Sequence, residues 1–370
     1  MLIRKVIVLA ILLFCQFSLG AQAFDARATK YAVIATKTGQ VLFSNMAEVR
    51  SPPASTTKLM TVLLALEYGK LHERVETSPH ATRAGGSSLY LRAGDRYSLE
   101  SLIYAAMLIS ANDACVAIAE HISGSEVGFV RRAKEIGMNN TTVQNPHGMP
   151  MRDHLSTAKD LAILGSVVVS IPKFTEIAGA TKHVLPGGRI IYNQNKLLGN
   201  FEGILSGKMG YTDEAGQCFV ANAERNGLNL VSVVLGSRGS AIWDETEELL
   251  TYGFTKYSRT THIRKYQTLA IKSNLLIGDL LLVAGEDFSV IEQVAQQSKV
   301  ATLLLIDRYI LPPVNRGEVL GSAEVYVNGV KTAAIPLVAA FDVPLFTATR
   351  VGLGVAAILL LSFLLVALRR

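Results

Sequence analysis

The sequence predicts an α/β domain, in which helices flank an antiparallel sheet, followed by a small all-β domain and a terminal membrane helix. Strand-like and helix-like hydrophobic patterns are mixed in the first part of the chain, short β-like pieces fill the later part, and an apolar run lies at each end. The length of 370 residues suits two domains. The 49% content of hydrophobic residues excludes a disordered or fibrous protein.

The amino-terminal segment, residues 1–23, predicts a secretory signal peptide. Arg4 and Lys5 precede the uncharged run VIVLAILLF, and the segment ends on the small-x-small sequence AQA at residues 21–23. An uncleaved anchor is the alternative, but it would need a longer apolar run. We therefore expect cleavage before Phe24 and export of the mature protein.

The carboxyl-terminal segment, residues 351–368, predicts a transmembrane helix. It carries no charge and would extend about 27 Å, close to the roughly 30 Å hydrocarbon core of a bilayer. Arg369 and Arg370 follow it, and the positive-inside rule places them in the cytoplasm. A buried core helix is the alternative, but the run has no polar face. We expect a single-pass protein of the cell membrane with its body outside and its carboxyl terminus inside.

The formal charge of +6 gives little support to nucleic-acid binding. Two positive charges, Arg4 and Lys5, leave with the signal peptide, and Arg369 and Arg370 lie inside, which leaves +2 on the exported body. No basic run is interleaved with aromatic residues. We therefore expect no nucleic-acid partner.

Two cysteines, Cys115 and Cys218, remain once the signal peptide and its Cys15 are removed. Export permits a disulfide between them. A single pair in a domain of this size is not a disulfide framework, and the sequence does not give their separation. Two free thiols are the preferred interpretation, with one disulfide as the alternative.

The body begins with a predicted β-hairpin over residues 30–45, joined at the Lys-Thr-Gly sequence of residues 37–39. A helix follows from Ser55, because two prolines end the extended structure and apolar residues then recur at helical spacing. Residues 99–109 predict a second helix. A break at Ser110-Ala111-Asn112-Asp113 precedes a third helix, ACVAIAEHI.

Two later segments, residues 203–223 and 228–236, predict the two strands of an antiparallel pair joined around Asn226-Gly227, a strong hairpin signal. A helix over residues 244–252 then closes the first domain, which we assign to residues 24–260.

The following domain, residues 264–342, alternates short β-like pieces with turn residues. Turns are predicted at Gly278-Asp279, at Asn328-Gly329, at Gly317 and at the Pro-Pro sequence of residues 312–313. This alternation of strand-like segments and turns predicts a small all-β domain.

The strongest candidate for chemistry is the pair Ser55 and Lys58. Their spacing at a helix start places them on one face, so the lysine amine can reach the serine hydroxyl. A serine is a poor nucleophile unless a base takes its proton, and a lysine of lowered pKa can do so. Taken alone, S-x-x-K also fits an ordinary helix-capping serine beside a solvated lysine.

Two further polar sets accompany this pair. The SAN sequence at residues 110–112 lies in the break between helices, where a hydroxyl and an amide could relay protons and hold a substrate amide; a helix cap is the alternative. The KMG sequence at residues 208–210 lies on a predicted strand, with Gly207 and Gly210 permitting close approach of another backbone. Its amine could bind a carboxylate, or could simply protect a sheet edge.

In this order and in an exported protein, S-x-x-K, S-x-N and K-x-G resemble the active-site motifs of the penicillin-recognising serine acyltransferases. The neighbouring sequence is similar to the low-molecular-weight D-alanyl-D-alanine carboxypeptidases, which are penicillin-binding proteins. It includes PPASTTKLMT, SANDACVAIAEHISGSE, NPHGMP and GYTDEAGQCFVANAERNG. The resemblance covers most of the chain from Tyr31 to Phe254 and implies a β-lactamase/transpeptidase-like fold; the β domain and terminal span also match that family's layout.

The resemblance also implies roles for individual residues. Ser55 would be the acylated nucleophile and Lys58 its general base, and backbone N–H groups of Ser55 and Tyr211 would form the oxyanion hole. The expected catalytic set is Ser55, Lys58, Ser110 and Asn112. The expected substrate-binding set is Lys208, Gly210, Tyr211 and Thr212. Within it, Lys208 would contact the terminal carboxylate of the substrate. No metal and no organic cofactor is implied.

The implied activity is that of a serine-type hydrolase in cell-wall biosynthesis and cell shape. It removes the terminal D-Ala from peptidoglycan stem peptides through an acyl-enzyme, and β-lactam antibiotics inhibit it covalently. One departure is Met209, where the family has threonine. One lost hydrogen bond to a charged group costs about 1.5–3 kcal/mol, roughly ten- to a hundredfold in rate.

Two alternatives therefore stay open. The chain could be a catalytically weakened homologue that binds peptidoglycan or acts as a scaffold. It could also be a β-lactamase, although no deacylating glutamate can be assigned.

His147 and His154 flank a loop without a third ligand at metal spacing, so we interpret them as structural rather than as zinc ligands. Trp243 lies at the start of a predicted helix, and we expect it to pack in the protein interior rather than to recognise a ligand.

Overall fold

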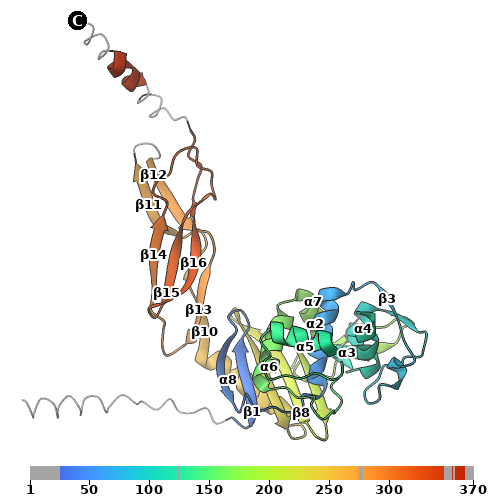
Figure 1. The fold of residues 1–370 in the computed structure, drawn as a ribbon. Helices are drawn as coiled ribbons and strands as arrows, with labels where there is room; N and C mark the ends of the chain where they lie inside the picture. The colour runs from blue at the N-terminus through green and yellow to red at the C-terminus, as the bar shows by residue number, and fades with distance from the viewer. Residues whose placement is uncertain (1–25, 123–125, 275–277, 346–351, 353–354, 363–370) are drawn as a thin grey trace, which may run out of the picture. The chain divides into compact units, whose positions relative to one another are not determined.

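The computed structural model describes residues 26–122, 126–274, 278–345, 352 and 355–362 (Figure 1). The chain divides into two compact units: Met1–Arg225 with Asn229–Gly253, and Asn226–Leu228 with Phe254–Arg370. The predicted signal peptide lies outside the described residues, as does much of the predicted membrane span.

The described residues contain no single helix that is long and apolar enough to cross a membrane. Two helices, α6 (Ala158–Val169) and α7 (Pro172–Gly179), meet the length and composition requirement only as a pair bent by 104°.

The first unit is built on a five-stranded sheet with the strand order β2-β1-β9-β8-β7. Strand β1 pairs antiparallel with β2 and with β9, and β7 pairs antiparallel with β8. Because β7 stands at the end of this order, no strand of the described chain pairs with its outer edge. The strands are β1 (Lys30–Ala35), β2 (Gln40–Asn45), β7 (Ile204–Thr212), β8 (Gly216–Arg225) and β9 (Leu228–Ser237).

Helices cover both faces of this sheet, and neighbouring strand residues face opposite helices. Val220 of β8 faces α6, where a Cβ added at Gly165 would lie 3.0 Å from its Cγ1. Phe219, the preceding residue, faces α8 (Ala241–Lys256) and stacks edge-on against Trp243 at 5.2 Å between ring centres. Since strand side chains alternate between faces, β8 is apolar on both sides.

Helix α2 (Lys58–Tyr68) lies at the centre of the helical part and contacts α3 (Leu99–Leu108), α4 (Asn112–His121), α5 (Glu126–Glu135) and α6 (Figure 1). Every residue of α2 from Lys58 to Ala65 is buried. A helix that is buried on all sides needs apolar residues all round, so the buried Lys58 stands out among them.

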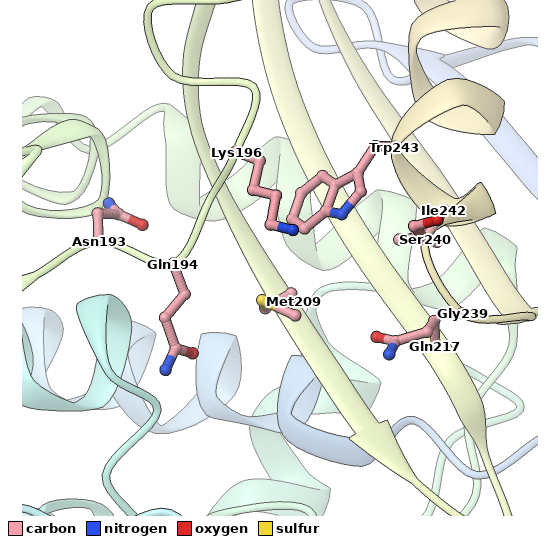
Figure 2. A pocket seen from close by; sticks show the side chains of 9 residues that line it. All are labelled: Asn193, Gln194, Lys196, Met209, Gln217, Gly239, Ser240, Ile242 and Trp243. Atoms are coloured by element: carbon pink, nitrogen blue, oxygen red, sulfur yellow. The ribbon is translucent and has the colours of Figure 1, made fainter.

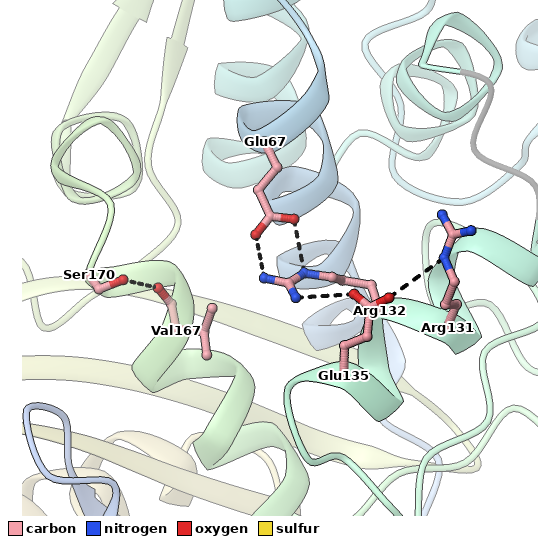
Figure 3. Close-up of polar contacts among 6 residues, drawn as sticks. All are labelled: Glu67, Arg131, Arg132, Glu135, Val167 and Ser170. Carbon is pink, nitrogen blue, oxygen red and sulfur yellow. Dashed lines mark hydrogen bonds and ion pairs between the residues drawn. The ribbon is translucent and has the colours of Figure 1, made fainter.

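A charged cluster ties α5 to α2 (Figure 3). The Arg132 guanidinium donates two hydrogen bonds to Glu67, of 3.0 and 2.7 Å, and a third of 3.2 Å to Glu135. A planar guanidinium matches a carboxylate with two parallel bonds. The pair therefore fixes how α5 lies along α2.

Smaller elements complete the first unit. Two short two-stranded sheets and two 3-10 turns are present: β3 (Arg74–Glu76) with β4 (Arg96–Ser98), β5 (Lys182–Val184) with β6 (Ile190–Tyr192), η1 (Ala54–Thr57) and η2 (Ala81–Arg83). Cys115 in α4 and Cys218 in β8 are both buried and free, so the preferred interpretation of two free thiols is confirmed. Burial raises the pKa of each thiol to about 11.

The second unit contains an all-β domain over residues 257–345, together with a helical stretch at residues 355–362. It contains a five-stranded sheet with the order β11-β12-β16-β15-β14 and a separate pair, β10 with β13. The predicted turn at Asn328-Gly329 joins β15 to β16, with φ of 52° and 85°. Its strands are β10 (Tyr257–Ile263), β11 (Thr268–Asn274), β12 (Gly278–Ala284), β13 (Phe288–Gln293), β14 (Val300–Ile306), β15 (Val319–Val327) and β16 (Val330–Ala339).

Three predictions of detail are wrong. The single strand predicted over residues 203–223 is two strands, because the Thr212 hydroxyl accepts a hydrogen bond from the Ala215 N–H and Gly216 takes a φ of 67°. The predicted turn at Gly278-Asp279 is the start of β12. The break between α3 and α4 is shorter than predicted, since Asn112 already begins α4.

The contact between α6 and the sheet gives a test of this packing. An alanine at an unconstrained helical glycine stabilises by about 1 kcal/mol. At Gly165, however, the new Cβ would lie 2.7 Å from Val231. We expect Gly165→Ala to lower the free energy of unfolding and Gly165→Val to lower it further, by about 1–3 kcal/mol. Urea denaturation measures both, and stabilisation by Gly165→Ala would show that α6 is not pressed against the sheet.

Candidate active site

The half-buried Ser55 lies in the 3-10 turn η1, directly before α2. The turn is fixed by its own threonines: Thr56 Oγ1 donates to the Pro53 carbonyl at 2.6 Å, and Thr57 Oγ1 donates to the Ala54 carbonyl at 2.9 Å. Ala54 takes a positive φ of 47°, a conformation that costs of order 1–3 kcal/mol in a residue with a side chain. Such strain is typical of functional sites, and here it immediately precedes Ser55.

The amine of Lys58 is the centre of the site. It is completely buried and lies 2.8 Å from Ser55 Oγ, 2.7 Å from Asn112 Oδ1 and 2.7 Å from the carbonyl oxygen of His147. A lysine ammonium has three N–H donors, so these three oxygens satisfy it. Burial lowers the pKa of Lys58 to about 8, so near neutral pH the amine can exchange a proton with Ser55.

Asn112 is held with its amide oxygen toward Lys58. Its Nδ2 donates to the Gly85 carbonyl at 2.8 Å, which fixes the orientation of the amide. Its backbone N–H donates to the Ser87 carbonyl at 2.7 Å. The segment before β4 therefore positions the first residue of α4.

The neighbouring Asp113 fastens the same segment to α4. Its carboxylate is buried and accepts hydrogen bonds from Ser88 Oγ at 2.6 Å and from the backbone N–H groups of Leu89, Leu91 and Ala114 at 2.9–3.0 Å. Its role is structural, since all of these partners belong to the local backbone and its loop. The sequence signal for it was only its place at a helix start.

Lys208 approaches from strand β7. Its amine is buried and donates to Ser110 Oγ at 3.2 Å and to the Met209 carbonyl at 2.7 Å. Ser110 takes a positive φ of 62° between α3 and α4. Burial, and next the nearby positive charge of Lys58, lower the pKa of Lys208 well below that of an exposed lysine. Ser110 thus stands beside a second buried amine.

Gly210 allows β7 to lie against the serine turn. A Cβ at this position would come 2.5 Å from the Ser55 nitrogen and 3.1 Å from its Cα. Tyr211 follows it on β7, is mostly exposed and donates from its hydroxyl to Asp213. The hydroxyl oxygen of Thr212 accepts a hydrogen bond from the Ala215 N–H in the β7–β8 turn. Within the described part of the chain, its side chain makes no hydrogen bond to the other predicted site residues.

The loop of residues 144–154 contacts both Lys58 and the serine turn η1. This contribution to the site was not predicted from the sequence. His147 supplies a backbone carbonyl to Lys58, and Gly148, with a φ of 89°, lies so close to the Ala54 carbonyl that a Cβ would collide with it. His154 Nδ1 accepts from the Gln144 N–H, so its Nε2 donates to Thr57 Oγ1 at 2.9 Å. Burial lowers the pKa of His147 and of His154 to about 4, so both imidazoles are neutral.

A groove of about 570 Å³ adjoins β7 on the sheet face that carries α8 (Figure 2). Met209 of β7, Gln217 of β8 and Ile242 and Trp243 of α8 line it, together with the segment of residues 193–196. Figure 2 shows the Lys196 side chain reaching toward the Trp243 ring, with Met209 on the neighbouring strand.

A serine on a helix start, a buried lysine of lowered pKa in contact with its hydroxyl, and a second lysine–serine pair beside it form the arrangement that serine acyl transfer requires. Sequence comparison agrees with this class: the family model described as D-alanyl-D-alanine carboxypeptidase (peptidase S11) matches residues 18–239. The chain belongs to this family. A second model, the C-terminal domain of penicillin-binding protein 5, matches residues 274–345 in the β unit.

Known relatives span most of the chain. The D-alanyl-D-alanine carboxypeptidase DacC of Escherichia coli (strain K12) is 32% identical over 86% of this chain and 84% of its own length. DacF of Bacillus subtilis (strain 168) is 31% identical over 86% of each chain. The crystal structure of penicillin-binding protein 5 from Haemophilus influenzae is 27% identical, covers 86% of this chain and 98% of its own, and has a TM-score of 0.66.

The Asp113 contacts predict a specific loss of stability. Asp113→Ala removes acceptors for a buried hydroxyl and three N–H groups, and we expect it to lower the free energy of unfolding by about 2–4 kcal/mol. Asp113→Asn keeps one acceptor and is the matched control, for which a smaller loss is expected. Thermal unfolding followed by circular dichroism compares them; equal losses would mean that these hydrogen bonds do not hold the loop.

Proposed function

We propose that this chain is a serine D-alanyl-D-alanine carboxypeptidase that removes the terminal D-Ala from peptidoglycan stem peptides through an acyl-enzyme. The observation that carries the proposal is the Lys58 amine, which is buried, of lowered pKa and 2.8 Å from Ser55 Oγ. Membership of the D-alanyl-D-alanine carboxypeptidase family supports the proposed substrate class. The substrate lies outside the cytoplasm, so the proposal includes export and a membrane span at residues 351–368.

In the acylation step, Ser55 Oγ attacks the carbonyl carbon of the penultimate D-Ala while the neutral Lys58 amine accepts the hydroxyl proton. The N–H groups of Ser55 and Tyr211 would stabilise the oxyanion, a role supported by the close approach of β7 at Gly210. The C–N bond then breaks, and the proton that Lys58 took from Ser55 passes through Ser110 to the leaving nitrogen, which returns Lys58 to its neutral form. Free D-Ala departs, and the rest of the peptide stays as an ester on Ser55.

In the deacylation step, a water molecule attacks the ester carbonyl while Lys58 accepts one of its protons. The C–O bond to Ser55 breaks, and Lys58 returns the proton to the serine oxygen. Asn112 would bind the substrate backbone and keep Lys58 in place, a role supported by its 2.7 Å contact with the amine. Lys208, bound to Ser110, would supply positive potential on the carboxylate side.

β-Lactams would acylate the same serine, since Ser55 Oγ would attack the ring carbonyl and the ring C–N bond would break. The nitrogen stays tethered and no group departs to make room for water, so the acyl-enzyme would persist. The structure of penicillin-binding protein D2 from Listeria monocytogenes in its ampicillin-bound form supports this proposal. That protein is 30% identical over 62% of this chain and 99% of its own, with a TM-score of 0.58.

A catalytically weakened, peptidoglycan-binding homologue is the second candidate, and Met209 is the observation that favours it. Its thioether cannot replace the hydroxyl expected at this position. The complete set of contacts around Lys58 nevertheless favours the enzyme.

Release of D-alanine from diacetyl-Lys-D-Ala-D-Ala by the purified full chain separates the two candidates. We expect release by the natural chain and by the control Ser170→Ala, an exposed serine at the end of α6, and none by Ser55→Ala. Binding of the peptide without any release would favour the weakened homologue. Rapid turnover of a β-lactam would instead indicate a β-lactamase.

The pH dependence of the reaction follows from the lowered pKa of Lys58. Below about pH 8 most molecules carry a protonated amine, which cannot accept the Ser55 proton. We therefore expect kcat/KM to rise with pH and to level off above about pH 8. A rate that is flat between pH 6 and 9 would contradict Lys58 as the base.

Restoring the missing hydroxyl tests the effect of Met209. We expect Met209→Thr to raise kcat/KM for diacetyl-Lys-D-Ala-D-Ala by roughly tenfold or more, because one hydrogen bond to a charged group is regained. Met209→Val, which adds no hydroxyl but has the shape of threonine, is the matched control. An equal effect of both variants would assign the change to side-chain size.

A further inference from the structure

The groove beside Met209 differs chemically from the site around Lys58. Lys208 pairs with Val220, on the face toward α6, whereas Met209 pairs with Phe219, on the face toward α8. Successive residues of β7 therefore serve opposite faces. The buried amines lie on one face, and the groove with its apolar Met209, Ile242 and Trp243 lies on the other.

A peptide bound to Ser55 can reach this groove along the outer edge of β7. That edge has no strand partner in the described chain, so an extended peptide can pair with it and add a strand to the sheet. Its successive side chains would then also alternate between the two faces. Gly210 is the β7 residue that lies against Ser55, and Met209 precedes it on the strand. A peptide whose penultimate carbonyl is at Ser55 would therefore place its last residue near Met209.

The groove contains one cationic side chain, Lys196. Its side chain is exposed, and its amine makes no hydrogen bond or ion pair within the described part of the chain. Lys208, by contrast, is buried and already bound to Ser110. The groove also contains the Gln217 Oε1 atom, which is buried without a hydrogen-bond partner among the described residues. Lys196 is therefore the cation best placed to meet an incoming carboxylate directly.

The apolar lining is larger than D-alanine requires. A methyl group is about the size of one water, roughly 30 Å³, whereas the groove measures about 570 Å³. Ile242 is buried beneath it, and Met209 and Trp243 are half-buried. A longer apolar side chain would cover these three residues and remove more apolar surface from water than a methyl group does.

We propose that this groove is the subsite for the residue that leaves, and that it accepts D-Ala but binds more tightly a last D-residue with a longer apolar side chain, with the terminal carboxylate on Lys196. The inference rests on the proposed function and uses the same step. The bond from Ser55 Oγ to the penultimate carbonyl forms, the C–N bond breaks, and the last residue leaves as a free D-amino acid with the proton on its nitrogen.

Trp243 is the single tryptophan of the chain, so its fluorescence reports binding in the groove without any need for turnover. The experiment titrates the full chain carrying Ser55→Ala with diacetyl-Lys-D-Ala-D-Leu and with diacetyl-Lys-D-Ala-D-Ala. We expect a fluorescence change for both and a Kd at least about tenfold lower for the D-Leu peptide. Equal Kd values, or no fluorescence change, would overturn the proposal.

Lys196→Gln, added to Ser55→Ala, tests the carboxylate contact. We expect it to raise the Kd of the D-Leu peptide about tenfold and to leave the Kd of the same peptide with a terminal amide unchanged. Lys37→Gln, an exposed lysine in the turn between β1 and β2, is the control and should change neither. An equal loss for acid and amide would contradict a carboxylate contact.

Cleavage by the natural chain separates this inference from the proposed function. If the chain releases D-Ala and D-Leu with equal kcat/KM, the selectivity is wrong while the carboxypeptidase stands. If the fluorescence titration shows the expected preference but no peptide is cleaved, the groove is a binding subsite and the carboxypeptidase proposal fails.

Discussion

The site depends on one physical constraint, the burial of the Lys58 amine. A buried cation is costly unless its donors are satisfied, and three oxygens from three separate segments satisfy this one: Ser55 in η1, Asn112 in α4 and the carbonyl of His147. Each segment must be held in place for the amine to be tolerated. The same burial lowers the pKa of Lys58, so the contacts that organise the fold locally also suit the amine to the proposed role of base.

In the proposed mechanism, strand β7 connects this buried centre to the bound substrate. Its glycine at Gly210 brings the backbone against Ser55, and the alternation of its side chains sends Lys208 inward and Met209 to the outer groove. A change at residue 209 can therefore alter recognition while leaving the amines untouched. That separation reconciles a complete set of contacts around Lys58 with a departure from the family pattern at Met209.

Local patterns predicted much of the fold and the core of the site. Periodicity gave the first hairpin and the helices α3 and α4, and a three-residue spacing gave the contact between Ser55 and Lys58. The division of residues 203–223 into two strands was missed because it depends on a hydroxyl bond from Thr212 and on one glycine φ. The His147 carbonyl and the groove could not be predicted, since a backbone oxygen has no sequence signature and the groove joins residues from 193 to 243.

The central claim is that Ser55, activated by Lys58, is the nucleophile, and intact-mass spectrometry of the full chain with penicillin G tests it most directly. The account predicts a covalent adduct of one penicillin per chain, mapped to Ser55 by peptide digestion and absent from Ser55→Ala. It also predicts much slower adduct formation by Lys58→Gln, because the serine then lacks its base. No adduct on the natural chain, or an adduct that persists in Ser55→Ala, would contradict it.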